Sequence, residues 1–437
     1  MKFILKKISL YNLLSNIAIS ILLFLFFFKL HFQSFIPISG DELNSILVYS
    51  SNIKTIFLKN FPGNITFFHF FGYLKTLFFS YDLISYRSIT FIFFVLHFWI
   101  LKKLKFNNNF ALLFLSLVFL SSSFTYYAGQ YTGYIFSSFI FILIFYLIKE
   151  NENEKHTKLI LFLLFIQIYN HLVNLYLVVP IIVSMFIYSK KKLFIKKFLF
   201  YYLLPTLSFY SISIILTGLA ILKVPNTNLD FIFLFLIENY QNVLLKGFNQ
   251  IFFYEAYLQA NNFNLIETLK DFFTYDSSIL ILFLISIIIS AINFKGDNKI
   301  FSVIIFIHVL TFFLIYKNPH PRIFTGFYCF YIFLIFDFLR EKKFLSNIKK
   351  NTNYFWLLLI IPIVQLINFD YLKNLKPVQY EDLNFLENKK SINYLKRECK
   401  LVNIEFSELQ KRNYYFNYIN LCNQKFSLNE FLKYYRS

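Results

Sequence analysis

Residues 132–148 read TGYIFSSFIFILIFYLI, a run without a charged side chain, and Lys149 follows directly. Such a run approaches the roughly 20 apolar residues that cross a bilayer as a helix. Similar runs recur along the 437 residues, of which 57% are hydrophobic and only 15% charged. Soluble domains are about 25% charged. The composition therefore predicts an all-α polytopic membrane protein.

The apolar runs predict eleven transmembrane helices. They lie near residues 10–30, 84–101, 109–126, 132–148, 158–170, 172–189, 198–222, 278–294, 300–316, 322–339 and 353–369. The weakest assignment is 158–189, one long apolar stretch that Asn170, His171 and Asn174 interrupt. Lysine clusters at both of its ends favour a hairpin returning to the same side. A single span there would reverse the orientation of every later segment.

The net charge of +20 is explained by where the cations lie. With the N-terminus inside, lysine and arginine gather in the short inside segments, whereas the short outside turns near 127–131, 171 and 317–321 contain only Lys317. The positive-inside rule predicts this asymmetry. The cations therefore indicate topology rather than binding of nucleic acid. We expect a multi-pass protein of the cytoplasmic (inner) membrane with a cytoplasmic N-terminus.

Three segments outside the spans are long enough to fold. Residues 31–83 form a first outside loop, in which 43–58 and 65–80 have the apolar spacing of helices lying in the membrane interface. Residues 223–277 form a second, acidic outside loop. Residues 370–437 predict a small C-terminal extracytoplasmic domain, which follows a transmembrane catalytic domain at 1–369.

Asp41 and Glu42 are the most informative polar pair, because they follow the first predicted span closely. Carboxylates are costly inside hydrocarbon, but a pair just outside it can stay charged and face a lipid-borne substrate. The simpler interpretation is a helix cap after Ser39-Gly40. His97, His308 and Asp337 fall inside predicted spans, where we favour helix-to-helix hydrogen bonding over a functional cavity.

The order of these features resembles the GT-C superfamily of integral membrane glycosyltransferases, which includes protein O-mannosyltransferases and aminoarabinose transferases. The resemblance covers about residues 10–340. It rests on the acidic motif Gly40-Asp41-Glu42, the span entry YDLISYR at 81–87, the turn from Tyr126 to Tyr134 with Gln130, the pair Asn170-His171, and Pro319-His320-Pro321-Arg322. Two departures stand out. Gly133 occupies the position of an arginine in many relatives, and Phe61-Pro62-Gly63 is a reduced form of the family's double-proline signature.

The resemblance implies an inverting enzyme that moves a hexosyl or pentosyl group from a polyprenyl-phosphate carrier to a glycan, lipid or protein acceptor outside the cytoplasm. Its oxocarbenium-like transition state needs a carboxylate for the acceptor proton and a cation or metal for the departing phosphate. Asp41 would be the base, and Glu42 would orient the acceptor or share a divalent metal with it. The remaining candidates are Arg322, Arg87 and Gln130 for the donor phosphate, and His69, His171 and His320 for substrate or metal contact.

Two alternatives remain open at this point. A polysaccharide polymerase or ligase also acts on polyprenyl-linked glycans, but it would rely on basic residues rather than on an acidic pair. A lipid-linked sugar transporter or flippase would more often have paired repeats and charged or broken helices near mid-span, which are not apparent in this sequence.

Overall fold

The structure is a computed structural model that describes residues 10–31, 42, 45–46, 50, 56–57, 66–78, 83–151, 154–222, 229–251, 265–293, 299–315, 321–341, 360 and 363–364. Within these ranges the regular structure is helical and contains no strand, which confirms the predicted all-α class. The tail 370–437 and nearly all of the predicted span 353–369 lie outside them.

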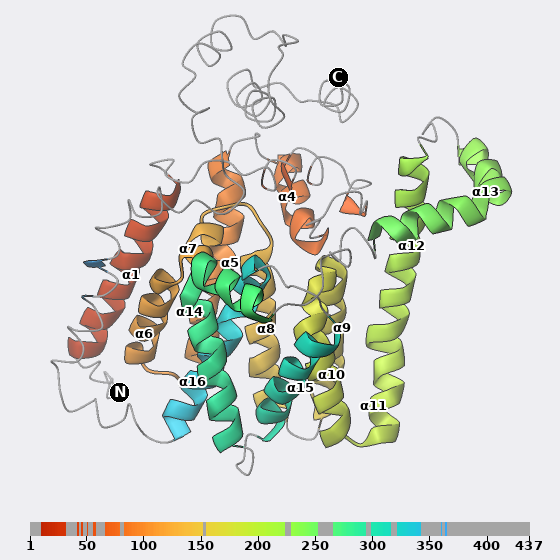
Figure 1. Ribbon diagram of the computed structural model, residues 1–437. Helices are drawn as coiled ribbons and strands as arrows, with labels where there is room; N and C mark the ends of the chain where they lie inside the picture. The colour runs from red at the N-terminus through yellow and green to blue at the C-terminus, as the bar shows by residue number, and fades with distance from the viewer. Residues whose placement is uncertain are drawn as a thin grey trace, which may run out of the picture.

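The helices follow the predicted apolar segments closely (Figure 1). In chain order they are α1 (Leu10–His31), α4 (Thr66–Phe78), α5 (Leu83–Lys103), α6 (Asn108–Leu120), α7 (Ser122–Ala128), α8 (Tyr134–Lys149), α9 (Thr157–Asn170), η3 (Leu172–Asn174), α10 (Leu175–Tyr188), α11 (Lys191–Phe198), η4 (Leu199–Leu203), α12 (Leu204–Ile221), α13 (Leu229–Asn249), α14 (Leu265–Ile292), α15 (Lys299–Ile315), η6 (Pro321–Gly326) and α16 (Tyr328–Glu341). The helix expected within 65–80 is therefore present as α4, and α4 and α13 lie toward one end of the bundle.

The expectation of eleven full spans is not confirmed by helix length. Among the described residues, one continuous helix, Lys191–Ile221, is long and apolar enough to cross a bilayer. The segment predicted as a span at 109–126 breaks at Ser121, where α6 and α7 meet at 97°, so it would count only as a broken span. Apolar helices such as α8, α9 and α10 are shorter.

The break at Ser121 is stabilised by Asp276, a buried residue at a kink within α14. Its carboxylate accepts hydrogen bonds from the Ser121 hydroxyl at 2.7 Å, from the Ser123 amide at 3.0 Å and from the Ser278 amide at 3.1 Å. One carboxylate thus caps α7 and the apolar half of α14 together, which satisfies amides that would otherwise be buried without partners.

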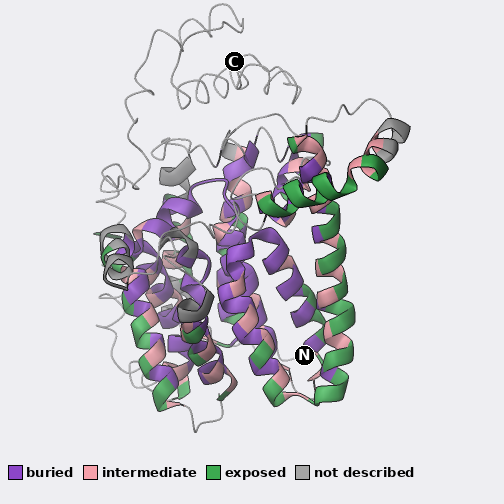
Figure 2. Ribbon diagram, turned by 45° about the vertical axis from the view of Figure 1, so that its right-hand side comes forward, coloured by how far each residue is buried: buried purple, intermediate pink, exposed green. Residues whose placement is uncertain are grey.

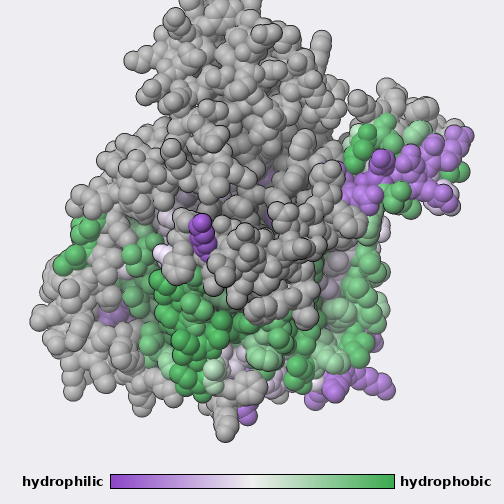
Figure 3. All heavy atoms as spheres, in the orientation of Figure 1, coloured by the Kyte–Doolittle hydropathy of each residue, from purple (hydrophilic) through white to green (hydrophobic). Residues whose placement is uncertain are grey.

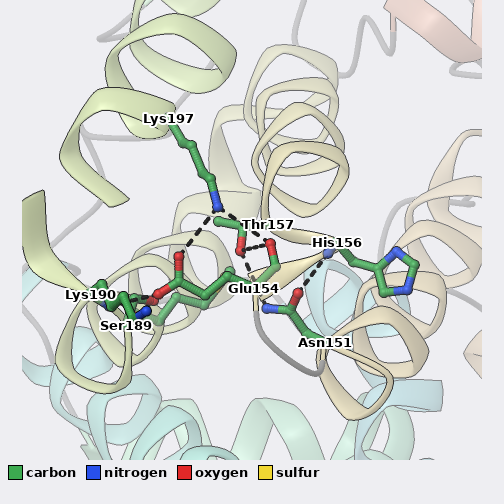
Figure 4. A network of polar contacts seen from close by, with 8 residues as sticks. Asn151, Glu154, His156, Thr157, Ser189, Lys190 and Lys197 are labelled. Atoms are coloured by element: carbon green, nitrogen blue, oxygen red, sulfur yellow. Dashed lines mark hydrogen bonds and ion pairs between the residues drawn. The ribbon is translucent and has the colours of Figure 1, made fainter. Parts of the chain in front are cut away.

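The predicted hairpin at 158–189 is present as α9 and α10. The Glu154 carboxylate accepts a hydrogen bond from the Lys190 amide at 2.7 Å and from Lys197 Nζ at 3.3 Å (Figure 4). These contacts place the start of α9 beside the start of α11, so the chain returns to the end from which it departed. The Lys190 amide, followed by Lys197, lowers the pKa of the Glu154 carboxyl.

Other basic helix ends also meet. Asp337 forms ion pairs with Lys149 at the end of α8 and with Arg340 on α16. Arg340 Nη1 also donates to the Leu104 carbonyl, just beyond α5, at 2.6 Å. The carboxylate of Asp337 therefore joins helix ends, in agreement with the structural role expected of it.

The two histidines inside predicted spans also join helices. Pro180 in α10 has no amide to donate, so the Tyr176 carbonyl lacks its usual helical partner. His308 Nδ1 donates to that carbonyl at 2.6 Å. His97 contacts the Phe93 carbonyl through Nδ1 and Ser138 Oγ through Nε2. Both agree with the predicted structural role.

The outward faces of the peripheral helices are apolar. Buried residues fill the centre of the bundle, while exposed positions follow its periphery (Figure 2). Large apolar side chains such as Ile92, Phe200, Leu207, Ile288 and Phe306 are each more than half exposed. On the face in Figure 3, hydrophobic side chains cover the part of the described surface between hydrophilic side chains on α13 and hydrophilic side chains at the opposite end. Soluble monomers rarely expose apolar surface so extensively.

Candidate functional site

The centre of the candidate site is a buried ion pair between Glu42 and Arg87, in the second turn of α5. Arg87 Nε donates to Glu42 Oε1 at 2.8 Å and Nη2 donates to Oε2 at 2.7 Å. The Tyr131 amide also donates to Oε1, at 2.7 Å. Glu42 is 0% exposed and Arg87 is 1% exposed. This bidentate geometry is the strong form of an arginine–carboxylate contact, and a further donor to the carboxylate helps to offset its desolvation.

The pair brings together three segments on which the sequence resemblance rests. Glu42 belongs to the acidic motif, Arg87 to the span entry at 81–87, and Tyr131 to the turn between α7 and α8. Both α5 and α8 begin at this end of the bundle and finish with lysines at the other. The site therefore lies at the end of these helices remote from Lys102, Lys103 and Lys149.

The hydrogen bonds to Glu42 limit the roles that its carboxylate can have. Both of its oxygens accept charge-assisted or amide hydrogen bonds, so its charge is already compensated by Arg87. A metal ion bound by Glu42 would have to displace the guanidinium. Among the residues that the structure describes, no group of three or more His, Cys, Asp or Glu side chains is placed to hold a metal ion. Glu42 therefore fits a positioning role better than a metal-ligand role.

Arg87, predicted to bind the donor phosphate, directs two of its guanidinium nitrogens at Glu42. Gln130, a second candidate for the phosphate, is buried and precedes the turn residue Tyr131. Arg322 lies in η6, whose Gly326 packs against Ser137 of α8, but its side chain is outside the described part of the structure. Asp41 and His320 also lie outside it.

The tip of the α9–α10 hairpin is hydrogen-bonded to α4, within the segment predicted as the first outside loop. Asn170 Oδ1, at the end of α9, accepts a hydrogen bond from the Phe67 amide in the first turn of α4 at 2.8 Å. The adjacent His171 caps η3 by accepting from the Val173 amide at 3.2 Å through Nδ1. His69 is buried on α4, with its ring 6.2 Å from that of Tyr131. Two of the three histidine candidates thus lie at the site end of the bundle.

The structure adds Tyr131 and Lys75, which sequence reasoning missed. Lys75 of α4 is 8% exposed, and its ammonium lies 3.9 Å above the ring of Tyr86. That ring is 5.1 Å from the ring of Tyr131. Lys75 is the only charged residue in the otherwise apolar sequence TFFHFFGYLKTLF, a signal that could have drawn attention to it.

No protein-family model, curated protein or solved structure matches this chain.

Proposed function

We propose that the chain is a membrane glycosyltransferase of the GT-C type. It transfers a sugar from a polyprenyl-phosphate donor to a glycan, lipid or protein acceptor on the extracytoplasmic face. The observation that carries this proposal is the buried Glu42–Arg87 pair with its hydrogen bond from Tyr131. It anchors the residue next to Asp41 at the helix end where the sequence features of the superfamily converge.

The proposed membrane location is supported by the apolar outer surface and the arrangement of basic residues. Exposed apolar side chains lie on the periphery of the bundle, whereas lysines lie at the ends of α5, α8 and α10 remote from the site. We propose an eleven-span arrangement with a cytoplasmic N-terminus. Its short helices would be accommodated by local thinning of the bilayer or by burial among neighbouring helices.

The proposed reaction is a single displacement. Asp41 accepts the proton of the acceptor hydroxyl while the acceptor oxygen forms a bond to the anomeric carbon. The bond from that carbon to the phosphate oxygen breaks, and the phosphate leaves on its polyprenyl carrier with the bonding electrons. Attack from the opposite face inverts the anomeric carbon. Arg322 is our candidate for stabilising the leaving phosphate, and Glu42 with Arg87 positions the motif that carries Asp41.

The test uses membranes containing the full chain and a polyprenyl-phosphate donor with a labelled sugar. A glycosyltransferase should produce labelled acceptor together with free polyprenyl phosphate. Growth of a lipid-linked glycan would favour the polymerase or ligase alternative. Movement of the intact donor across the membrane, without cleavage, would favour a transporter or flippase.

The topology gives a separate prediction. Reporter fusions after residues 60, 250 and 400 should report the outside, and fusions after 104, 153 and 346 should report the inside, because the lysine-rich segments stay in the cytoplasm. The hydrogen bond between Glu154 and the Lys190 amide supports the proposal that the two ends of the α9–α10 hairpin lie on the same side. An inside signal at 250 and 400 would contradict the arrangement beyond the hairpin.

Arg322→Ala should weaken use of the donor. A guanidinium can pair with phosphate in both the bound donor and the transition state, so its loss is expected to cost about 1.5–3 kcal/mol. The measurement is donor affinity in detergent-solubilised protein. Arg340→Ala at the opposite end removes an arginine from a comparable helix end and should keep donor affinity. Wild-type affinity in folded Arg322→Ala would exclude this role.

A further inference from the structure

Tyr131 contacts the first outside loop at several separate points. Its amide donates to Glu42, and its hydroxyl lies 3.0 Å from Ser50 Oγ and 3.5 Å from the Phe68 carbonyl. The hydroxyl also fills the space beside Gly72, where a Cβ atom would lie 1.9 Å from it. One residue of the α7–α8 turn therefore touches the acidic motif, the following segment and α4.

The ring of Tyr131 is also held firmly. It is 0% exposed and lies 4.6 Å from the ring of Phe68 and 5.1 Å from that of Tyr86. Burial raises the pKa of its hydroxyl well above the usual value, so this group acts as a neutral hydrogen-bonding group. Gly72 has no side chain that would displace the Tyr131 hydroxyl. Close packing of this kind transmits a change at one residue to its neighbours.

The turn that carries Tyr131 is itself anchored in the bundle. The Gly129 amide donates to the Tyr126 carbonyl at 3.1 Å, and the Thr132 amide donates to the Gln130 carbonyl at 2.8 Å. The start of α7 is capped by Asp276 from α14. Tyr131 thus connects the first outside loop to a fixed point among the helices.

We propose that Tyr131 is a positioning residue, whose ring and hydroxyl set the location of the acidic motif relative to the helix bundle. This inference rests on the proposed function, because the motif matters for catalysis only if Asp41 is the base. Tyr131 acts through Glu42, Ser50 and α4, and it needs no contact with either substrate. A small displacement of the motif would misalign the base with the acceptor hydroxyl.

The kinetic test compares Tyr131→Phe, Ser50→Ala and the double variant. Tyr131→Phe keeps the ring and the amide bond to Glu42 but loses the hydroxyl contacts, so kcat should fall roughly tenfold. The KM for the donor should stay near the wild-type value. Ser50→Ala should lower kcat in the same way, and the double variant should be no slower than the slower single variant, because both remove one shared hydrogen bond.

The matched control is Tyr210→Phe. Tyr210 is also buried, and its hydroxyl donates to the Ile168 carbonyl at 2.7 Å, between α12 and α9. Its substitution removes a similar hydrogen bond without touching the first outside loop, so kcat should be preserved. An equal loss in Tyr210→Phe, or unchanged kcat in both Tyr131→Phe and Ser50→Ala, would overturn the inference.

A second measurement does not depend on activity. The protein carries Cys399→Ser and Cys422→Ser, and Asp41→Cys introduces a thiol in the acidic motif. The measured quantity is the rate at which this thiol reacts with a membrane-impermeant maleimide. Adding Tyr131→Phe or Ser50→Ala should change that rate. Tyr210→Phe should leave that rate unchanged. Altered labelling together with absence of sugar transfer by the unmodified chain would support the positional coupling and reject the proposed function. Unaltered labelling in both variants would reject the coupling itself.

Discussion

Arg87→Ala should destabilise the protein by about 3–5 kcal/mol, because it leaves the Glu42 carboxylate buried without its counter-charge. Glu42 is fully buried and receives two hydrogen bonds from the guanidinium, so water cannot readily replace the lost partner. The Tyr131 amide, which also donates to Glu42, is neutral and does not replace the lost charge. The loss should appear as a lower midpoint of thermal unfolding in detergent and a lower yield of inserted protein.

A double-mutant comparison identifies the charge as the cause. Glu42→Gln alone should also destabilise, because it leaves the Arg87 charge buried opposite a neutral amide. Glu42→Gln combined with Arg87→Met removes both charges and should be more stable than Arg87→Met alone. Wild-type stability of Arg87→Ala would contradict the assignment of this pair. Because Glu42 is paired with the buried Arg87, Glu42→Gln should be a more severe change than expected if Glu42 only oriented the acceptor.

The positions of the apolar helices were largely predictable, because charged residues bound the long apolar runs of this sequence. The predicted span at 84–101 corresponds to α5, and that at 132–148 corresponds to α8. The segment predicted at 198–222 begins earlier, at Lys191, since lysine is a good helix former and its stem can lie along an apolar surface. The hairpin could be inferred from the lysines at its two ends, and in the structure Glu154, just before α9, contacts Lys190 and Lys197, which follow α10.

The break within 109–126 was not predictable from apolarity alone. The serines at 121–123 offer an N-cap, but the carboxylate that stabilises the break belongs to Asp276, far along the chain. In the second outside loop, residues 229–249 form α13, which packs closely on α12. A Cβ at Gly218 would lie only 2.1 Å from the Val243 carbonyl oxygen. These features depend on tertiary contacts that a local pattern does not contain.

The candidate site, too, was only partly predictable from the sequence. The sequence order identified the segments that contain Glu42, Arg87 and Gln130, but it did not pair Glu42 with Arg87. Asp82 is the carboxylate nearest to Arg87 in the sequence, and it lies outside the described residues. A bidentate pair across 45 positions is visible only once the segment that contains Glu42 is placed beside α5. Tyr131 was missed because aromatic residues are common throughout this chain.

Asp41→Asn is expected to lower turnover by at least roughly 10²-fold, the size of effect associated with loss of a general base. Asparagine keeps the size of the side chain and some of its hydrogen bonding, but it cannot take the acceptor proton. Insertion and thermal stability should be preserved, in contrast to Arg87→Ala, because the buried pair stays intact. The measurement is single-turnover sugar transfer from a polyprenyl-phosphate donor in membranes with matched protein levels.

The control for Asp41→Asn is Glu150→Gln, which removes an acid from an exposed position directly after α8, at the end of the bundle remote from the site, and should leave transfer unchanged. If Asp41→Asn instead transfers sugar at the wild-type rate, Asp41 is only a cap at the start of an interfacial helix. The base would then belong to the second outside loop, where Asp230, Glu238 and Glu255 are the acids to replace next. Since the Glu42–Arg87 pair would persist in that case, its role would be to hold the loop in place rather than to position a base.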